Sequence, residues 1–188
     1  MGCNPLLKVL VLGANGQLGR ALQKSYNNSN IILTALPKEL CDVTNHSDVN
    51  KYITKEKYDC VINAAAYTDV QNAEKDRDLS KKINCDALKN ICSAIVDKKS
   101  LLVHFSTDYV FDGGTGRAYL EDDNTNPINQ YGISKLNGEK VIENSGINYL
   151  IFRTSWVYDN YSINFPNKII EMLKSKESLK VVDDQIGT

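Results

Sequence analysis

The sequence is poor in the residues that bind metal ions or form cross-links. Among its 188 residues there are only five cysteines and two histidines. No two cysteines have the spacing C-x-x-C, and His46 and His104 lie far apart, whereas zinc sites combine closely spaced ligands. We therefore expect no metal site, and we expect reduced and mostly buried thiols.

The sequence also lacks an excess of positive charge and a long hydrophobic run. Lysine and arginine number 22 against 23 acidic residues, for a formal net charge of -1. This balance argues against nucleic acid or a membrane surface as a partner, and it favours a small molecule. The apolar runs at 7–13 and 100–106 are far shorter than a bilayer span, and no basic segment followed by an apolar stretch begins the chain. We therefore expect a cytoplasmic protein.

Short β-branched runs alternate with longer helical patterns, which is typical of an α/β fold with a doubly wound parallel sheet. The runs are almost continuously apolar, as expected for strands that are buried on both faces. Strands are predicted at 8–12, 30–35, 59–63, 101–106, 148–152 and, as a sixth, 179–182. Helices are predicted at 17–27, 47–55, 77–97, 130–145 and 163–175, and a long loop at 112–129.

Three glycines with the spacing G-x-x-G-x-x-G follow the first predicted strand: Gly13, Gly16 and Gly19. Glycine permits a tight turn and a close backbone approach to a pyrophosphate, and the helix that begins here offers free N–H groups. An ordinary strand-to-helix turn is the alternative. The position of the glycines between a strand and a helix favours dinucleotide binding, as in a Rossmann-like domain.

The second predicted strand ends without the carboxylate that would bind the ribose of NAD. The sequence there, "LTALPK", also lacks an arginine for the 2′-phosphate of NADP, although Lys38 and Thr34 are candidates to help. We therefore expect NADPH or NADH as cofactor, with a slight preference for NADPH. Asp42 and Val43 follow in a loop that could line the adenine, and Asp42 is equally a candidate to cap the next helix.

Small and hydroxyl residues end the third and fourth predicted strands. Ala64, Ala65 and Ala66 leave room for a ligand, or for packing beneath a helix. Ser106 and Thr107 are either turn formers or hydroxyls of a site. In a doubly wound sheet ligands bind beyond the carboxyl ends of the strands, and this position favours a ligand site.

Tyr131 and Lys135, in "YGISK", lie four residues apart at the start of a predicted helix and therefore share one face. A solvated surface pair is the alternative to a catalytic one. Reduction of a ketone needs a proton for the nascent alkoxide, and a phenol with a pKa of about 10 exchanges its proton slowly at neutral pH. A lysine ammonium nearby is expected to lower the pKa of Tyr131, and Thr107 could bind the carbonyl oxygen.

Together, "STDYVFDG", "YGISK" and "RTSWVY" resemble the extended short-chain dehydrogenase/reductase superfamily, and within it the reductases of dTDP-linked 6-deoxy-4-keto sugars. The resemblance implies reduction of the C4 ketone by NADPH or NADH to give dTDP-L-rhamnose, a precursor in polysaccharide biosynthesis. It implies the catalytic residues Thr107, Tyr131 and Lys135. It implies cofactor contacts at Gly13, Gly16, Gln17, Leu18, Gly19, Asp42, Val43, Ala65, Ala66, Tyr67, Tyr131 and Lys135. It implies substrate contacts at Val70, Thr107, Asp108, Tyr109, Phe111 and Trp156.

The sequence departs from these reductases in three respects. Gln71 replaces an acidic residue that is common after the third strand. Ala21 replaces a glutamate that helps some relatives to bridge a homodimer through magnesium, so a homodimer without this metal bridge is expected. The relatives continue with a substrate-binding portion, so residues 1–188 are predicted to be an NAD(P)-binding Rossmann domain that ends where that portion starts.

Two other functions fit the same motifs. The first is a sugar-nucleotide epimerase or dehydratase, which would keep and recycle its dinucleotide. The second is a non-catalytic dinucleotide-binding regulatory subunit, similar to the beta subunit of methionine adenosyltransferase. Stoichiometric consumption of NAD(P)H distinguishes the reductase from both.

Overall fold

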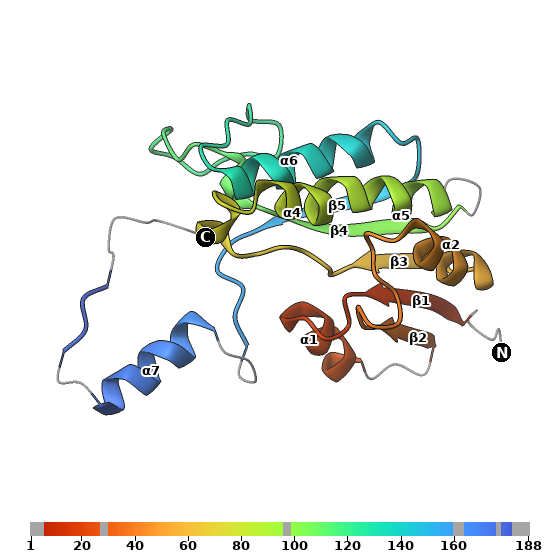
Figure 1. The fold of residues 1–188 in the computed structure, drawn as a ribbon, viewed down its shortest axis with the longest axis horizontal. Helices are drawn as coiled ribbons and strands as arrows, with labels where there is room; N and C mark the ends of the chain where they lie inside the picture. The colour runs from red at the N-terminus through yellow and green to blue at the C-terminus, as the bar shows by residue number, and fades with distance from the viewer. Residues whose placement is uncertain (1–5, 27–29, 96–98, 160–163, 176–177, 182–188) are drawn as a thin grey trace.

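A single parallel sheet organises the computed structural model, which describes residues 6–26, 30–95, 99–159, 164–175 and 178–181 (Figure 1). The strand order is β2-β1-β3-β4-β5. The direction of chain progression across the sheet therefore reverses between β1 and β3. The strands are β1 (Leu7–Leu12), β2 (Ile31–Leu36), β3 (Cys60–Asn63), β4 (Leu101–Thr107) and β5 (Tyr149–Thr154). The predicted α/β class with a doubly wound parallel sheet is confirmed.

Helices connect the strands, and right-handed crossovers place α1 on one face of the sheet and α2, α5 and α6 on the other. The last three pack side by side, α2 against α5 and α5 against α6. The α-helices are α1 (Gln17–Ser25), α2 (His46–Lys55), α3 (Val70–Ala73), α4 (Arg77–Lys81), α5 (Ala87–Ile95), α6 (Gln130–Glu143) and α7 (Phe165–Ser175). A π-helix, η1 (Lys82–Asp86), and a 3-10 turn, η2 (Asp108–Val110), complete the set in the described part of the chain.

Two predictions about these elements were wrong. The single helix predicted over 77–97 is interrupted by the π-helix η1, and residues 96 and 97 lie outside the described residues. The predicted sixth strand is absent from residues 179–181, and its last position, 182, also lies outside. The short elements α3 and η2 were not predicted, whereas residues 112–129 form the expected irregular loop.

The core lies between the sheet and the layer of α2 and α5. Its fully buried residues come from the strands and from the inner faces of these helices: Leu10, Leu12, Val49, Val61, Leu88, Ile91 and Leu102. By contrast α7 has no buried residue and lies away from the sheet in Figure 1. The buried strands hold their carboxyl ends in a fixed register, in which Asn63 of β3 stands between Leu12 of β1 and His104 of β4.

Candidate active site

A pocket lies at the carboxyl edge of the sheet, beside the ends of β1 and β3, where the strand order reverses. Open α/β sheets bind their ligands at this switch point. The pocket brings together six of the predicted cofactor residues with the lysine that follows β2. It is lined by Gly13, Gly16, Lys38, Cys41, Asp42, Val43, Thr44, Ala64, Ala65, Ala66 and Ile83.

The glycine turn that floors this pocket leaves no room for side chains. Gly13 has a φ of 81°, and a Cβ built on it would lie 2.6 Å from the backbone nitrogen of Ala65. A Cβ on Gly19 would lie 2.3 Å from the carbonyl oxygen of Gly13. Gly16 is the N-cap of α1, and no side chain caps this helix. Backbone N–H groups at the start of α1 are therefore available to a phosphate.

Asp42 also lines the pocket. Its Oδ1 accepts hydrogen bonds from the backbone nitrogen and from Oγ1 of Thr44, both at 2.9 Å. Burial tends to raise the pKa of this carboxyl, but the two bonds from Thr44 and the charges of Lys38 and Lys82 hold it below its ordinary value. The alternative prediction, that Asp42 caps the next helix, was wrong, because Asn45 caps α2 by accepting from Ser47 and Asp48 through its Oδ1.

Six other predicted cofactor residues are not among the described residues that line this pocket: Gln17, Leu18, Gly19, Tyr67, Tyr131 and Lys135. The side chain of Gln17 donates to the carbonyl oxygen of Val157 at 3.2 Å and so connects α1 with the segment after β5. Leu18 is half-buried in α1. The backbone of Tyr67 exchanges two hydrogen bonds of 2.9 Å with the side chain of Asn84.

Thr107 and Tyr131 meet at the next strand end along the same edge. Thr107 ends β4, Tyr131 lies in the first turn of α6, and the Thr107 hydroxyl is close enough to act on the pKa of the phenol. This hydroxyl donates to Oδ1 of Asp108 at 3.0 Å and accepts from the backbone nitrogen of Tyr109 at 3.2 Å. Burial raises the pKa of Tyr131, the Thr107 hydroxyl opposes this, and Asp108 and Tyr109 add to the rise. The prediction of a lowered pKa was therefore wrong for Tyr131, because burial and its acidic neighbour outweigh the effect of Thr107.

Lys135 shares a helical face with Tyr131, but its amine is directed toward β4. The side chain is buried, and Nζ donates to the carbonyl oxygen of Phe105 at 2.5 Å. Nζ also lies 3.4 Å from Nε2 of His104. Burial lowers the pKa of Lys135 to about 8, partly offset by the charge of Glu139.

The predicted substrate residues lie on several separate elements. Asp108 and Tyr109 stand in the turn η2 beside the catalytic candidates, and the ring of Tyr109 packs edge-on against Tyr131 with a centroid distance of 5.9 Å. Val70 begins α3 and is half-buried. Phe111 instead stacks on the ring of Tyr119, at 4.1 Å between centroids, and belongs to the loop that follows η2.

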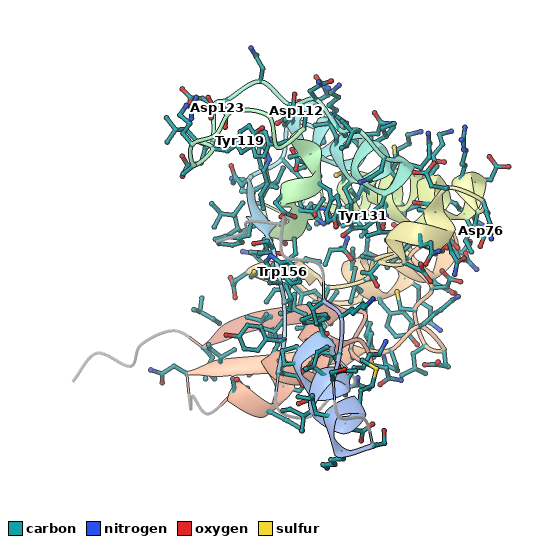
Figure 2. The ribbon with its side chains drawn as sticks, turned by 90° about the vertical axis from the view of Figure 1, so that its left-hand side faces the viewer. Asp76, Asp112, Tyr119, Asp123, Tyr131 and Trp156 are labelled. Carbon is teal, nitrogen blue, oxygen red and sulfur yellow. The ribbon has the colours of Figure 1, made fainter. Side chains whose placement is uncertain are left out.

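Trp156 lies apart from that loop, on the chain after β5. In Figure 2 it is separated from Asp112, Tyr119 and Asp123, which cluster at one end of the molecule. Trp156 has a φ of 51°, an unusual conformation for a bulky residue, and 48% of its surface is exposed. Its ring packs edge-on against Phe165, with a centroid distance of 5.9 Å.

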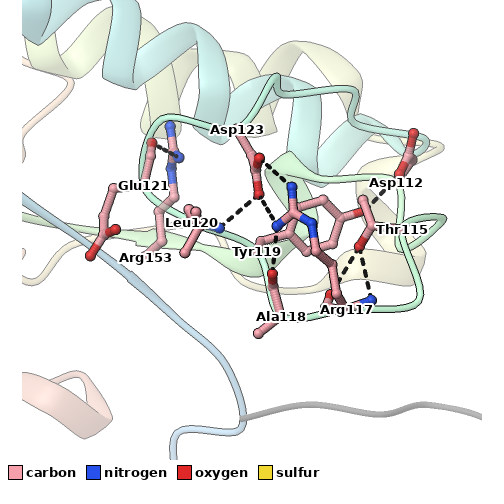
Figure 3. A network of polar contacts seen from close by, with 9 residues as sticks. All are labelled: Asp112, Thr115, Arg117, Ala118, Tyr119, Leu120, Glu121, Asp123 and Arg153. Atoms are coloured by element: carbon pink, nitrogen blue, oxygen red, sulfur yellow. Dashed lines mark hydrogen bonds and ion pairs between the residues drawn. The ribbon is translucent and has the colours of Figure 1, made fainter.

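A polar network orders the loop between η2 and α6 (Figure 3). Arg117 makes two parallel bonds of 2.8 and 2.7 Å to the carboxylate of Asp123. Asp112 accepts from Asn126, Gly114 and Tyr119, and these bonds lower its pKa to about 2. The long loop predicted from the sequence is therefore held together by its own side chains.

Sequence reasoning missed the buried polar residues beneath the catalytic candidates. Asn84 in η1 donates to Oγ of Ser134 at 2.9 Å, and Ser134 donates to the carbonyl oxygen of Tyr131. Glu139 is buried and pairs with Arg153 at 2.7 Å. The available signal was the presence of polar residues at positions where the helical pattern predicts apolar ones.

Metal-ligand clusters and membrane-spanning helices are both absent from the described ranges. There, no group of three or more His, Cys, Asp or Glu residues could hold a metal ion. None of the helices described above has both the length and the apolar character needed to cross a membrane.

Comparisons with known proteins show which family the chain is similar to. The chain matches the family described as RmlD substrate binding domain over residues 7–188. It is 39% identical over 181 residues to a dTDP-4-dehydrorhamnose reductase of Burkholderia thailandensis, a match that covers 96% of this chain and 60% of the relative.

Solved structures show the same similarity. A dTDP-4-dehydrorhamnose reductase of Clostridium acetobutylicum is 40% identical and has a TM-score of 0.92, covering 97% of this chain and 65% of that one. A Bacillus anthracis dTDP-4-dehydrorhamnose reductase in complex with NADP is 39% identical, with a TM-score of 0.88 over 90% of this chain and 60% of that one. The chain thus spans about 60% of the length of the curated relative above. By its match over residues 7–188, the chain belongs to the RmlD substrate binding domain family.

Proposed function

We propose that the whole protein reduces the C4 ketone of a dTDP-linked 6-deoxy-4-keto sugar with NADPH or NADH, and so forms dTDP-L-rhamnose. The observation that carries this proposal is the proximity of Thr107 and Tyr131 at the same sheet edge as the glycine pocket. Relatives named dTDP-4-dehydrorhamnose reductase support the choice of substrate. One relative was solved with NADP, which supports the choice of cofactor.

The pocket fits a dinucleotide. A Cβ at Gly13 would collide with the backbone of Ala65, so the turn keeps the surface open for a pyrophosphate, and the uncapped start of α1 supplies N–H donors. Asp42 and Val43 would line the adenosine. When bound, the reduced nicotinamide supplies the hydride.

The protein itself supplies the proton. The raised pKa of Tyr131 keeps the phenol protonated at neutral pH, which is the form that an acid must have before it donates. Thr107 lies beside Tyr131 and would hold the substrate oxygen next to the phenol. Lys135 lies on the same helix face, and its buried amine would bind the cofactor ribose.

Lys38 favours NADPH over NADH. It follows β2 and lines the pocket together with Asp42. Among the described lining residues, no carboxylate stands between β2 and Asp42 to attract a free ribose hydroxyl. A lysine ammonium is a strong binder of phosphate. We further propose a cytoplasmic location, and that any homodimer forms without a magnesium bridge, because Ala21 cannot coordinate a metal.

The test is the oxidation of NADPH by full-length protein in the presence of the dTDP-linked 4-keto sugar. Tyr131→Phe is expected to lower turnover by about 10²- to 10⁴-fold while NADPH still binds, because only the proton donor is removed. Tyr149→Phe, at a partly exposed position on β5, is the matched control and should keep wild-type turnover. Unchanged turnover in Tyr131→Phe would remove the proton-donor role.

The same assay separates the alternatives. An epimerase or dehydratase would convert its sugar without net consumption of NADPH. A regulatory subunit would bind NADPH and consume none with any sugar substrate. Stoichiometric oxidation of NADPH is the result expected here.

A further inference from the structure

The imidazole of His104 is a buried titratable group that the proposed reaction does not use. It lies on β4, three residues before Thr107, with 1% of its surface exposed. In the sheet register it stands directly beside Asn63 of β3. Both of its ring nitrogens face polar groups, Asn63 on one side and Lys135 on the other.

Asn63 determines which ring nitrogen of His104 carries the proton. The backbone N–H of Ala65 donates to Oδ1 of Asn63 at 3.2 Å, so the amide nitrogen of Asn63 is the atom turned toward the histidine. This amide nitrogen lies 3.2 Å from Nδ1 of His104 and can only donate. Nδ1 is therefore the acceptor, and a neutral ring must carry its proton on Nε2.

The protonated Nε2 faces the amine of Lys135. The separation is 3.4 Å, and Nζ donates in another direction, to the carbonyl oxygen of Phe105. An ammonium has no lone pair and would set N–H against N–H at this contact, whereas a neutral amine can accept. The geometry is therefore complementary to Lys135 without its proton.

The charged groups around Lys135 are engaged elsewhere, so the contact of its amine with His104 dominates. On its own helix Lys135 faces Glu139, which is already paired with Arg153 of β5 at 2.7 Å. The acidic Asp108 of η2 acts on Tyr131. From α4 and η1, the residues bonded to the buried side of α6 are the uncharged Ser80 and Asn84.

We propose that His104, oriented by Asn63, is a positioning residue that favours Lys135 as a neutral amine at alkaline pH, so that binding of the anionic dinucleotide there takes up one proton onto this lysine. The inference rests on the proposed function, since it assigns Lys135 to the cofactor ribose. Burial of the amine acts in the same direction and makes the neutral form accessible from a pH of about 8. No bond to carbon changes in this step, and the proton comes from solvent.

Histidine-selective ¹⁵N NMR tests the tautomer without any activity measurement. The chain has two histidines, and the exposed His46 provides the reference signal. At pH 9, His104 is expected to show a protonated Nε2 and a bare Nδ1. Asn63→Asp should reverse this pattern, because a carboxylate accepts from Nδ1–H, whereas the isosteric control Asn45→Asp at the exposed cap of α2 should not.

Calorimetry of NADPH binding to the full-length protein tests the proton uptake. Titrations at pH 9 in two buffers of different ionisation enthalpy report the number of protons bound, and the phosphates of NADPH are fully ionised at this pH. We expect an uptake close to one proton for the wild type. The amide oxygen of Gln in His104→Gln can accept from an ammonium, so this variant should reduce the proton uptake by at least about half. It should also shift the alkaline limb of the pH profile of kcat/KM upward by about one pH unit.

The outcomes separate the two proposals. If NADPH does not bind, the proposed function and this inference both fail. If NADPH binds and is oxidised by the keto sugar, but His104 carries its proton on Nδ1 or binding takes up no proton, only this inference fails. If the alkaline limb of the pH profile of kcat/KM is unchanged in His104→Gln, His104 has only a packing role and this inference fails as well.

Discussion

Replacement of Lys135 by methionine is expected to stabilise the protein at neutral pH. Burial lowers the pKa of this lysine from 10.5 to about 8. Each pKa unit corresponds to about 1.4 kcal/mol, so burying the ammonium at pH 7 costs about 3 kcal/mol. Methionine keeps the apolar stem and loses the bond to the carbonyl oxygen of Phe105, worth about 1 kcal/mol. The net gain in the free energy of unfolding is about 2 kcal/mol.

The gain depends on pH in a direction fixed by linkage. Because the folded pKa lies below the unfolded one, the unfolded state binds more protons between pH 8 and 10.5, and wild-type stability rises through this window. The variant has no such group and does not share the rise. Its advantage over the wild type should therefore shrink to nothing near pH 10.

Urea unfolding at pH 7 and at pH 10 measures both differences. Lys140→Met is the matched control, because Lys140 is an exposed lysine on the same helix and should change stability by less than about 0.5 kcal/mol. The reasoning is refuted if Lys135→Met is less stable than the wild type at pH 7. It is also refuted if the difference between the two proteins is the same at both pH values.

Three further predictions concern other residues of the site. Lys38→Glu should weaken binding of NADPH relative to NADH by about tenfold, because a carboxylate repels the 2′-phosphate, and the ratio of the two dissociation constants checks it. Arg153→Met should lower the free energy of unfolding by about 3–5 kcal/mol by leaving the buried Glu139 unpaired, and Glu139→Leu added to it should restore most of this loss. Gly19→Ala should cost more than about 2 kcal/mol in urea unfolding and weaken NADPH binding, since the new Cβ would lie 2.3 Å from the carbonyl oxygen of Gly13. Full stability of Gly19→Ala would contradict the packing argument. A double variant that is no more stable than Arg153→Met would contradict the ion-pair argument.

Patterns that depend on neighbours in sequence predicted the fold well. Apolar runs located the five strands to within about two residues, and the glycine spacing located the turn of the pocket. Features that depend on residues far apart in the sequence could not be predicted from it. The π-helix η1 lies where α6 comes so close that a Cβ on Gly138 would lie 2.2 Å from the carbonyl oxygen of Asn84. The "LKVV" segment has strand propensity, but within 178–181 it pairs with no strand.

Helix α6 shows why the site itself was only half predictable. A helix that packs on a core normally carries an apolar stripe, yet the buried face of α6 holds Ser134, Lys135 and Glu139. Each of these polar groups is satisfied by a different distant element: Asn84 from η1, the carbonyl of β4, and an arginine from β5. The spacing of Tyr131 and Lys135 on one face can be deduced from a helical period, but the direction of the amine and the pKa of the phenol cannot. They are set by three segments that only the folded sheet brings together.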